Sequence, residues 1–389
     1  MPRPLFCSNH GCPFHFHPPP NWCVRFGTYD TIAHGTVQRY LCRHCRRSLG
    51  DQTESVHYYA KRRLPLKAVY QSLLGGSSLR EIARRYRVSS TAVRYGMFRL
   101  GRQAMCAQLL LLSRLNPRHT LVADGLRSFL SSQDYPCDIT TVVEPQGETI
   151  LSMCHSVFRR GGTMRPYQRR RVAKKLSVWR PRKGGMSEDI AGLIKELWEY
   201  LRPEVSHPAL IHTDEHPLYR ALLVRDSTTA HFRMARLVSH RRTPGTAART
   251  IENPLFPVNY VDRLLRHRLK EHTRQTIAFG RNATLQMHRA WIFAHDHNCN
   301  REYRVKHPKE GTHAEQGAVD GKTVREVNRE FFQRRIRVEE VSVPPSIRRV
   351  WMAQLPTPPV RWKKGQKSAT IRVPFFAIRD LGPNHQQAS

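Results

Sequence analysis

Apolar residues recur at helical spacing in residues 64–104. Four of them fit one face of a helix, at i, i+3, i+4 and i+7: Leu79, Ile82, Ala83 and Tyr86. Ser78 and Glu81 match a capping box at the start of this helix. Residues 87–90 form a short turn into a second helix that directs Val93, Met97 and Leu100 inward. The pattern predicts a helix-turn-helix, although any small helical hairpin would share it.

Beyond Pro117 the pattern becomes typical of a sheet. Three β-prone runs come first, and Gln146-Gly147 marks a hairpin turn between the last two. An amphipathic helix, a strand, a short helix from Pro217 and another strand follow. The predicted strands are residues 120–123, 139–143, 149–153, 210–214 and 232–238, and the amphipathic helices are 187–201 and 258–269. This order predicts a ribonuclease H-like layout, a mixed sheet flanked by helices.

Three aspartates occupy notable places in this scheme. Asp214 follows the apolar residues Leu210 and Ile211 and precedes a helix start, and Asp124 ends a similar apolar run. Asp262 lies beside the apolar stripe of the last helix. A single Asp at such a place can simply cap a helix, and Asp262 can pair with Arg266 at i, i+4. Together they could bind two Mg²⁺ or Mn²⁺ ions, with Asp124 bridging both.

The charge balance restricts the partners of the chain. Its 389 residues contain 65 Lys and Arg against 30 Asp and Glu, a formal charge of +35. Nucleic acid is the natural partner of such a chain, and an anionic membrane surface is the alternative. We find no run of about 18 apolar residues that could span a bilayer. The N-terminal residues lack the apolar region that a signal peptide would need. We therefore expect a cytoplasmic, nucleoid-associated protein that binds double-stranded DNA.

Two regions supply candidate DNA contacts. The second helix of a helix-turn-helix enters the major groove, and its outward residues here are Arg94, Tyr95 and Arg99. Residues 159–183 contain no Asp or Glu, and Gly161-Gly162 and Gly184-Gly185 lie near their ends. This segment is predicted to be a mobile loop that contacts phosphates through Arg169, Arg170 and Arg171, rather than a solvated run of charge.

The cysteines indicate a metal site. Four of the nine form two close pairs, Cys7-x4-Cys12 and Cys42-x2-Cys45, as in a zinc ribbon. We expect a structural Zn²⁺ on these four thiolates, because so short a segment cannot bury a sizeable core. Other possible ligands for the first pair are Cys23, His10, His15 and His17.

With these motifs, the chain resembles insertion-sequence transposases of the D-D-E type that carry an N-terminal zinc ribbon and helix-turn-helix. The resemblance covers roughly residues 5–300 and is carried by residues 39–45, 78–97, 123–125, 212–219 and 259–281. It implies cleavage at element ends, joining of 3′-hydroxyls to target DNA, and Asp124 and Asp214 as metal ligands. The family often has Glu as the third metal ligand. Glu252 is therefore the alternative to Asp262 for this position.

The domain prediction follows: zinc ribbon 1–58, helix-turn-helix 59–114, catalytic domain 115–300 with a basic insertion 155–185, and a basic, Pro-containing region 301–389. Pro344-Pro345 and residues 356–359 are expected to break that last region into extended pieces. We expect a homo-oligomer on DNA. The alternatives are a catalytically inactive DNA-binding regulator derived from a transposase, an RNA-binding protein, and a nuclease or resolvase on the same fold.

Overall fold

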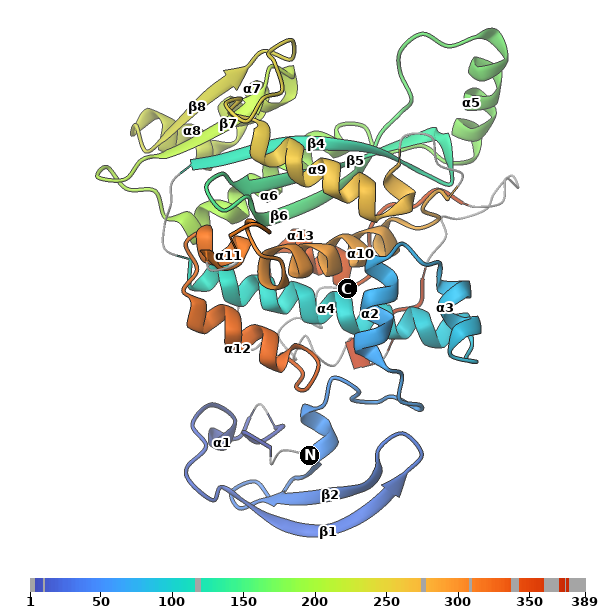
Figure 1. Cartoon of the computed structure of the whole chain (residues 1–389), viewed down its shortest axis with the longest axis vertical. Coiled ribbons are helices and arrows are strands. Elements are labelled where there is room, and N and C mark those ends of the chain that lie inside the picture. Colours follow the sequence, from blue (N-terminus) through green and yellow to red (C-terminus); the bar gives the residue numbers. More distant parts are fainter. Residues whose placement is uncertain are drawn as a thin grey trace.

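The computed structural model describes residues 4–9, 11–115, 120–273, 278–307, 310–336, 343–359, 371–374 and 376–377. It is a mixed α/β structure with two separate sheets (Figure 1). The smaller sheet lies at the lower end in this view, and the larger lies toward the upper end, with helices between them.

The small sheet is antiparallel, in the order β1-β2-β3. Its strands and flanking short helices are α1 (Pro13–Phe16), β1 (Cys23–Thr31), β2 (Gly35–Cys42), β3 (Ser48–Gly50) and η1 (Asp51–Glu54). Its apolar core is small and contains Trp22, Tyr40 and Leu49 beside the cysteines. So little buried apolar surface leaves this module dependent on a further crosslink.

The next three helices are α2 (Leu66–Leu74), α3 (Leu79–Arg85) and α4 (Ser90–Ser113). The hydroxyl of Ser78 accepts a hydrogen bond from the Glu81 backbone N–H at 3.1 Å, and Ser89 caps α4 in the same way. The first cap confirms the predicted start of α3, and the second shows that α4 begins within the predicted turn at residues 87–90. Ile82, Ala83, Val93, Met97 and Leu100 are buried as the stripes predict.

The long helix α4 runs through the centre of the molecule, because almost every residue from Gly96 to Leu112 is buried. At Gly101 it crosses α10 (Ala283–His295) so closely that a Cβ would lie 2.2 Å from the Nδ1 atom of His288. One continuous hydrophobic core extends from Val56 to Leu355. The α2–α4 helices therefore share their core with the large sheet.

The large sheet has five strands in the order β6-β5-β4-β7-β8. The pairs β4/β5 and β5/β6 are antiparallel, and the pairs β4/β7 and β7/β8 are parallel. The strands are β4 (Thr120–Leu130), β5 (Ser132–Glu144), β6 (Thr149–Val157), β7 (Ala209–Asp214) and β8 (Val238–Thr243). This sheet confirms the predicted mixed sheet flanked by helices.

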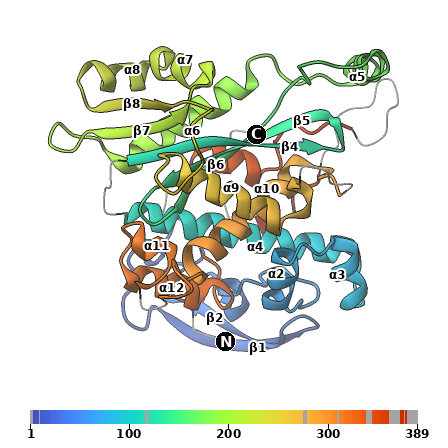
Figure 2. The same cartoon turned by 45° about the horizontal axis from the view of Figure 1, so that its top comes forward.

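Helices cover both faces of the large sheet. One face packs on α4, α9 and α10, and the other packs on α6 and α7. The helices that follow β6 are α5 (Pro166–Val178), α6 (Gly185–Leu201), α7 (Pro217–Arg225), α8 (Ser227–Met234), α9 (Phe256–Arg268) and η2 (Lys270–His272). Turned by 45°, the molecule shows α7 and α8 above the sheet and α9, α10 and α4 below it (Figure 2).

Three sequence expectations are wrong here. Residues 232–238 were expected to be a strand, but Phe232 lies in α8, which begins after the Asp226 cap, and the strand starts only at Val238. The basic segment contains helix α5 rather than a mobile loop. Pro344-Pro345 begins a helix, since proline is tolerated in a first helical turn.

The C-terminal part adds to the core instead of remaining extended. Its elements are η3 (Asp296–Asn300, a π-helical turn), α11 (His313–Gln316), α12 (Gly321–Phe331) and α13 (Pro345–Trp351). Val324, Val327 and Phe331 bury one face of α12, and Trp351 is 1% exposed. Gly147, in the predicted hairpin turn, leaves room for α11, because a Cβ there would lie 2.2 Å from the Gly317 nitrogen.

Candidate functional site

The parallel pairing of β4 with β7 brings two of the predicted aspartates together. Thr120 pairs with Leu210 and Val122 with His212, so the same register continued by two residues sets Asp124 level with Asp214. Side chains alternate between the faces of a strand, and neighbouring strands lie about 4.8 Å apart. The two carboxylates therefore lie side by side on one face of the sheet.

Local chain geometry holds each carboxylate. Asp214 is the last residue of β7, and its Oδ1 atom accepts a hydrogen bond of 3.0 Å from the His216 backbone N–H, just before Pro217 begins α7. Asp124 accepts one of 2.7 Å from the Gly125 N–H. Asp124 was expected to end its strand, but β4 continues to Leu130, so Asp124 lies within β4 while the neighbouring β7 ends at Asp214.

Asp262 reaches the same face of the sheet from helix α9. The apolar stripe of this helix, Val258, Val261 and Leu265, is fully buried as predicted. The stripe fixes α9 against β4 and β5. Asp262 is itself 8% exposed, and its Oδ1 atom has no hydrogen-bond partner among the described residues. Leaving a buried carboxylate oxygen without a partner is costly, so this oxygen is a good candidate for a ligand.

Electrostatics show that the three carboxylates influence one another. Burial raises the pKa of Asp124 to about 6, the Gly125 N–H lowers it, and the charges of Asp214 and Asp138 raise it further. The pKa of Asp262 is raised well above its ordinary value by burial, then by the charge of Asp124. Asp124 thus interacts with each of the other two. A bound cation would relieve this accumulation of negative charge.

Asp138 is an acidic residue of this region that sequence reasoning missed. It lies on β5, is 4% exposed, and accepts a hydrogen bond of 2.7 Å from the Thr140 hydroxyl. Its carboxylate occupies the space over Gly125, where a Cβ would meet Asp138 Oδ1 at 2.5 Å. Strand alternation places it on the sheet face opposite Asp124. A carboxylate between Cys137 and Ile139, in an otherwise apolar strand, was the signal available in the sequence.

The alternatives for the third carboxylate are poorly placed. Glu252 is exposed in the turn before α9, and its charge is not among those that shift the pKa of Asp124 or Asp262. The Arg266 guanidinium donates a hydrogen bond to the His272 carbonyl at 3.2 Å, and its charge lowers the pKa of Asp262 from a distance. The motif residues 274–277 lie outside the described residues.

Within the described part of the chain, the four predicted cysteines are the one group of His, Cys, Asp or Glu placed closely enough to hold a metal ion, with all their ligand atoms within 4.8 Å of one another. The three aspartates are not part of such a group.

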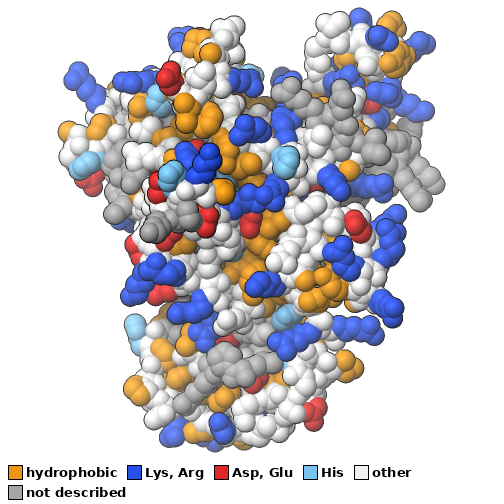
Figure 3. Space-filling view, viewed as in Figure 1, with side chains coloured by type: hydrophobic (Ala, Val, Ile, Leu, Met, Phe, Trp, Pro, Cys, Tyr) orange, Lys and Arg blue, Asp and Glu red, His pale blue; other side chains and the backbone are white. Residues whose placement is uncertain are grey.

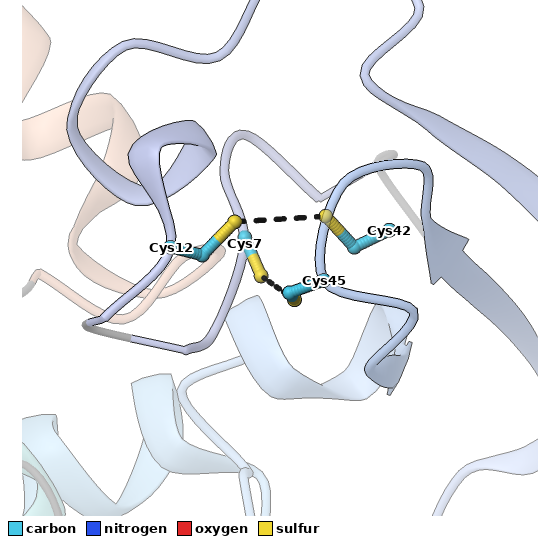
Figure 4. A group of neighbouring side chains, drawn as sticks. All are labelled: Cys7, Cys12, Cys42 and Cys45. Atoms are coloured by element: carbon cyan, nitrogen blue, oxygen red, sulfur yellow. Dashed lines mark hydrogen bonds between the residues drawn. The ribbon is translucent and has the colours of Figure 1, made fainter.

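The four-cysteine group joins both predicted pairs (Figure 4). The sulfur atoms of Cys7 and Cys45 are 3.4 Å apart, and those of Cys12 and Cys42 are 3.9 Å apart. A tetrahedron with Zn–S distances of about 2.3 Å has sulfurs about 3.8 Å apart, so the group is compatible with structural zinc.

The other candidate zinc ligands that the structure describes lie outside the four-cysteine group. His15 Nδ1 lies 2.6 Å from the Cys7 carbonyl oxygen, His17 is exposed, and Cys23 is not in the group. His10 lies outside the described residues.

The thiols of the group ionise unequally. Burial raises the pKa of Cys7 and of Cys12. Burial opposes ionisation of Cys45 as well, but hydrogen bonds from the Arg47 backbone and from Cys7 lower its pKa to about 7. The Cys45 thiol thus ionises more readily than those of Cys7 and Cys12, and metal binding by those two must release protons.

The predicted DNA contacts differ in exposure. Arg94 and Tyr95 are half-buried on α4. Arg99 was expected to face outward, but it is buried: it donates a hydrogen bond to the Val56 carbonyl and stacks on the Phe376 ring at 3.8 Å. Sequence periodicity does not reveal that the C-terminal segment covers this face. Arg169, Arg170 and Arg171 are all exposed on α5.

Comparisons with known proteins leave the function to be argued from this site: the chain matches no family model and no curated protein. Among the described residues, no helix is both long enough and apolar enough to cross a membrane.

Removing the charge of Asp124 should stabilise the metal-free protein. The folded state raises the pKa of Asp124 from 3.8 to about 6, so it binds this proton more tightly than the unfolded state does. The free energy of unfolding should therefore fall as pH rises from about 4 to about 6. At pH 7, without magnesium, Asp124→Asn should be more stable than wild type by on the order of 3 kcal/mol, and the difference should vanish near pH 4.

Urea unfolding across this pH range measures the effect, with Glu215→Gln as the exposed neighbouring control. An Asp124→Asn protein that is less stable than wild type at pH 7 would contradict the burial of charge at this site.

Zinc binding should depend on the four cysteines alone. Purified protein should contain one zinc per chain, and Cys42→Ser should lose it because three thiolates leave a coordination position open. Cys23→Ser is the matched control, since Cys23 pairs directly with Cys42 across β1 and β2 but is not in the group. Atomic emission measures the metal content, and full zinc in Cys42→Ser would exclude this ligand set.

Proposed function

We propose that this protein is a DNA transposase that cleaves DNA at the ends of an insertion element and joins the 3′-hydroxyls to target DNA. The observation that carries the proposal is the placement of Asp124 and Asp214 on adjacent parallel strands, with Asp262 buried against the same face. Three carboxylates on one sheet face suit Mg²⁺ or Mn²⁺ and the phosphoryl transfer such ions support.

The topology of the large sheet supports a ribonuclease H-like catalytic domain. Three antiparallel strands come first in the chain, and two parallel strands follow, separated by helices. The middle strand β4 therefore has a parallel neighbour on one side and an antiparallel neighbour on the other. This is the layout that the sequence pattern predicts for residues 115–300.

Each acidic residue has a role in this proposal. Asp124 would contact both ions, because it is the carboxylate that interacts with each of the other two. Asp214 and Asp262 would each add a carboxylate ligand to one of the two ions. When bound, the two ions activate the attacking hydroxyl or water and stabilise the leaving oxygen. The α9 stripe fixes Asp262 in place, and the turn at His216 fixes Asp214.

We assign DNA binding to the N-terminal region, residues 1–114, and to the basic segment, residues 159–183. The four-cysteine module would be a zinc ribbon, and α3 with α4 a helix-turn-helix that presents Arg94 and Tyr95. Four further arginines are exposed on α3 and in the turn after it: Arg80, Arg84, Arg85 and Arg87. They support a phosphate-binding role for this region, since phosphate contacts supply most non-specific affinity. Assembly as a homo-oligomer on DNA belongs to the same proposal.

A DNA-binding regulator derived from a transposase is the second candidate. The observation that favours it is that, among the described residues, only the four cysteines lie closely enough together to hold a metal ion, and the three aspartates do not. Such a protein would bind the same DNA through the same N-terminal region. It would show no metal-dependent chemistry and would tolerate changes at Asp124.

Carboxylate variants should separate the two candidates. With DNA that flanks the coding sequence and Mg²⁺ or Mn²⁺, wild type should produce nicked and joined products. Asp214→Asn should lose at least about 1000-fold in rate, which corresponds to about 4 kcal/mol of lost transition-state stabilisation. Its affinity for the same DNA should remain, because the proposed DNA contacts lie elsewhere.

A second pair of variants tests the third carboxylate. Asp262→Asn should be as inactive as Asp214→Asn, whereas Glu252→Gln, exposed in the turn before α9, should retain activity. Gel analysis of end-labelled DNA measures both. Products from all variants would show that these carboxylates are not catalytic, and no product from wild type would favour the regulator.

A further inference from the structure

Helix α5 stands away from the body of the molecule, beyond the hairpin that joins β4 to β5 (Figures 1 and 2). It lies in a stretch, residues 159–183, without a single acidic residue. Val172 is its one buried residue, and its main contacts are with β5. Leu176 and Trp179 pack against the core only in part, so this helix gains from a further interaction that holds it in place.

That interaction is provided by Asp134, at the start of β5. This carboxylate is 2% exposed and forms ion pairs of 2.7 Å with each of Arg160, Arg171 and Lys175. Burial opposes its ionisation, but the hydrogen bonds from Arg171 and Lys175 lower its pKa overall. Tyr135 adds a hydrogen bond from its hydroxyl to the Lys175 carbonyl at 3.0 Å. One buried carboxylate thus fixes the inner side of α5 to the sheet.

The outer side of α5 carries cations of a different kind. Arg170 and Lys174 are exposed, lie one helical turn apart, and have no ion-pair partner in the described parts of the chain. Arg169 flanks them and donates a hydrogen bond to the Met164 carbonyl at 3.0 Å. In the space-filling view, Lys and Arg side chains gather on this projecting part of the molecule (Figure 3). Of the three arginines predicted to contact phosphates, Arg171 is therefore set apart, because its guanidinium pairs with Asp134 although it is partly exposed.

We propose that α5 is a fixed arm that grips the phosphate backbone of a DNA duplex through Arg170 and Lys174, with Asp134 setting its position. The inference deepens the proposed transposase function and, for its position along the DNA, rests on it. Two cations one turn apart on a helix held by buried ion pairs lose less freedom on binding than cations on a mobile loop.

The position of the arm can be estimated from the sheet. Asp124 and Leu130, where β4 turns into the hairpin, are six residues apart on one strand, about 20 Å at about 3.3 Å per residue. We place the duplex along β4, so that its rise of about 3.4 Å per base pair lets α5 contact phosphates about six base pairs from the phosphate that reacts at Asp124. We assign this side of α5 to DNA rather than to a contact between subunits, because its exposed Arg170 and Lys174 would repel the same cations on a second copy.

The first experiment measures binding to a duplex of arbitrary sequence by fluorescence anisotropy over a range of salt concentrations. Arg170→Ala/Lys174→Ala should bind roughly 10- to 60-fold more weakly at 0.1 M salt and reduce the slope of log affinity against log salt by about 2. Lys322→Ala/Arg329→Ala is the matched control, because it removes two exposed cations from α12 and should have a smaller effect. Equal effects of the two double variants would overturn the proposal, as would tighter binding to an RNA duplex than to DNA.

The second experiment tests the anchor and the spacing. Ethylation interference on cleaved flanking DNA should locate phosphates about six base pairs from the cleaved bond, and Arg170→Ala/Lys174→Ala should abolish interference there. Asp134→Asn removes a negative charge and so makes the protein more basic. It should nevertheless lose the interference at the same phosphates, because α5 is no longer fixed. Retained interference in both variants would contradict the arm. If wild type does not cleave, the transposase proposal fails, and the anisotropy experiment still decides whether α5 binds DNA.

Discussion

Parallel pairing of β4 with β7 places Asp124 beside Asp214, and the proposed chemistry depends on this contact more than on any other. The pairing sets two like charges one strand spacing apart on a face that α9 covers with apolar side chains. The cost is visible in the raised pKa values of Asp124 and Asp262. A protein that keeps such a group together without metal gives up stability that a bound cation would restore.

The rest of the molecule positions this group. Helix α9 presents Asp262 only because Val258, Val261 and Leu265 on its other positions are fully buried. Helix α4 extends the same core from the sheet to the short helices α2 and α3. The candidate DNA-reading helices and the candidate catalytic face therefore share one core, whereas the four-cysteine module has its own small core. The predicted division into domains at residues 58, 114 and 300 stays a prediction.

Sequence patterns were most informative where one physical rule dominates. Helical spacing predicted α3, α6 and α9 with their buried faces, and Ser78 and the turn at residues 87–90 predicted the starts of α3 and α4. The cysteine spacing predicted the four-cysteine group, since short pairs of thiols have few other uses. The order of the strands in the large sheet could be read as well, although helices α5 and α8 were missed, because apolar runs and turn residues alternate along that stretch.

The remaining features depend on contacts between distant segments, which spacing does not encode. Arg99 lies at an outward position of its helix but is covered by Phe376, nearly 280 residues later in the chain. The basic segment was expected to be a loop because it is dense in Arg and Lys and has glycine pairs near its ends. The ion pairs of Asp134, on the neighbouring strand β5, with Arg171 and Lys175 could not be read from that pattern. The Asp138 carboxylate lies buried on the sheet face opposite the candidate site because Gly125, on the adjacent strand, leaves space for it.

Crystals of the protein soaked with Mn²⁺ offer the most direct test of the carboxylate group, because anomalous scattering locates this metal independently of any activity. We expect manganese bound to oxygens of both Asp124 and Asp214, with Asp262 completing the site from α9. Crystals in which manganese binds elsewhere, or in which Asp124 and Asp214 share no ion, would contradict the central claim.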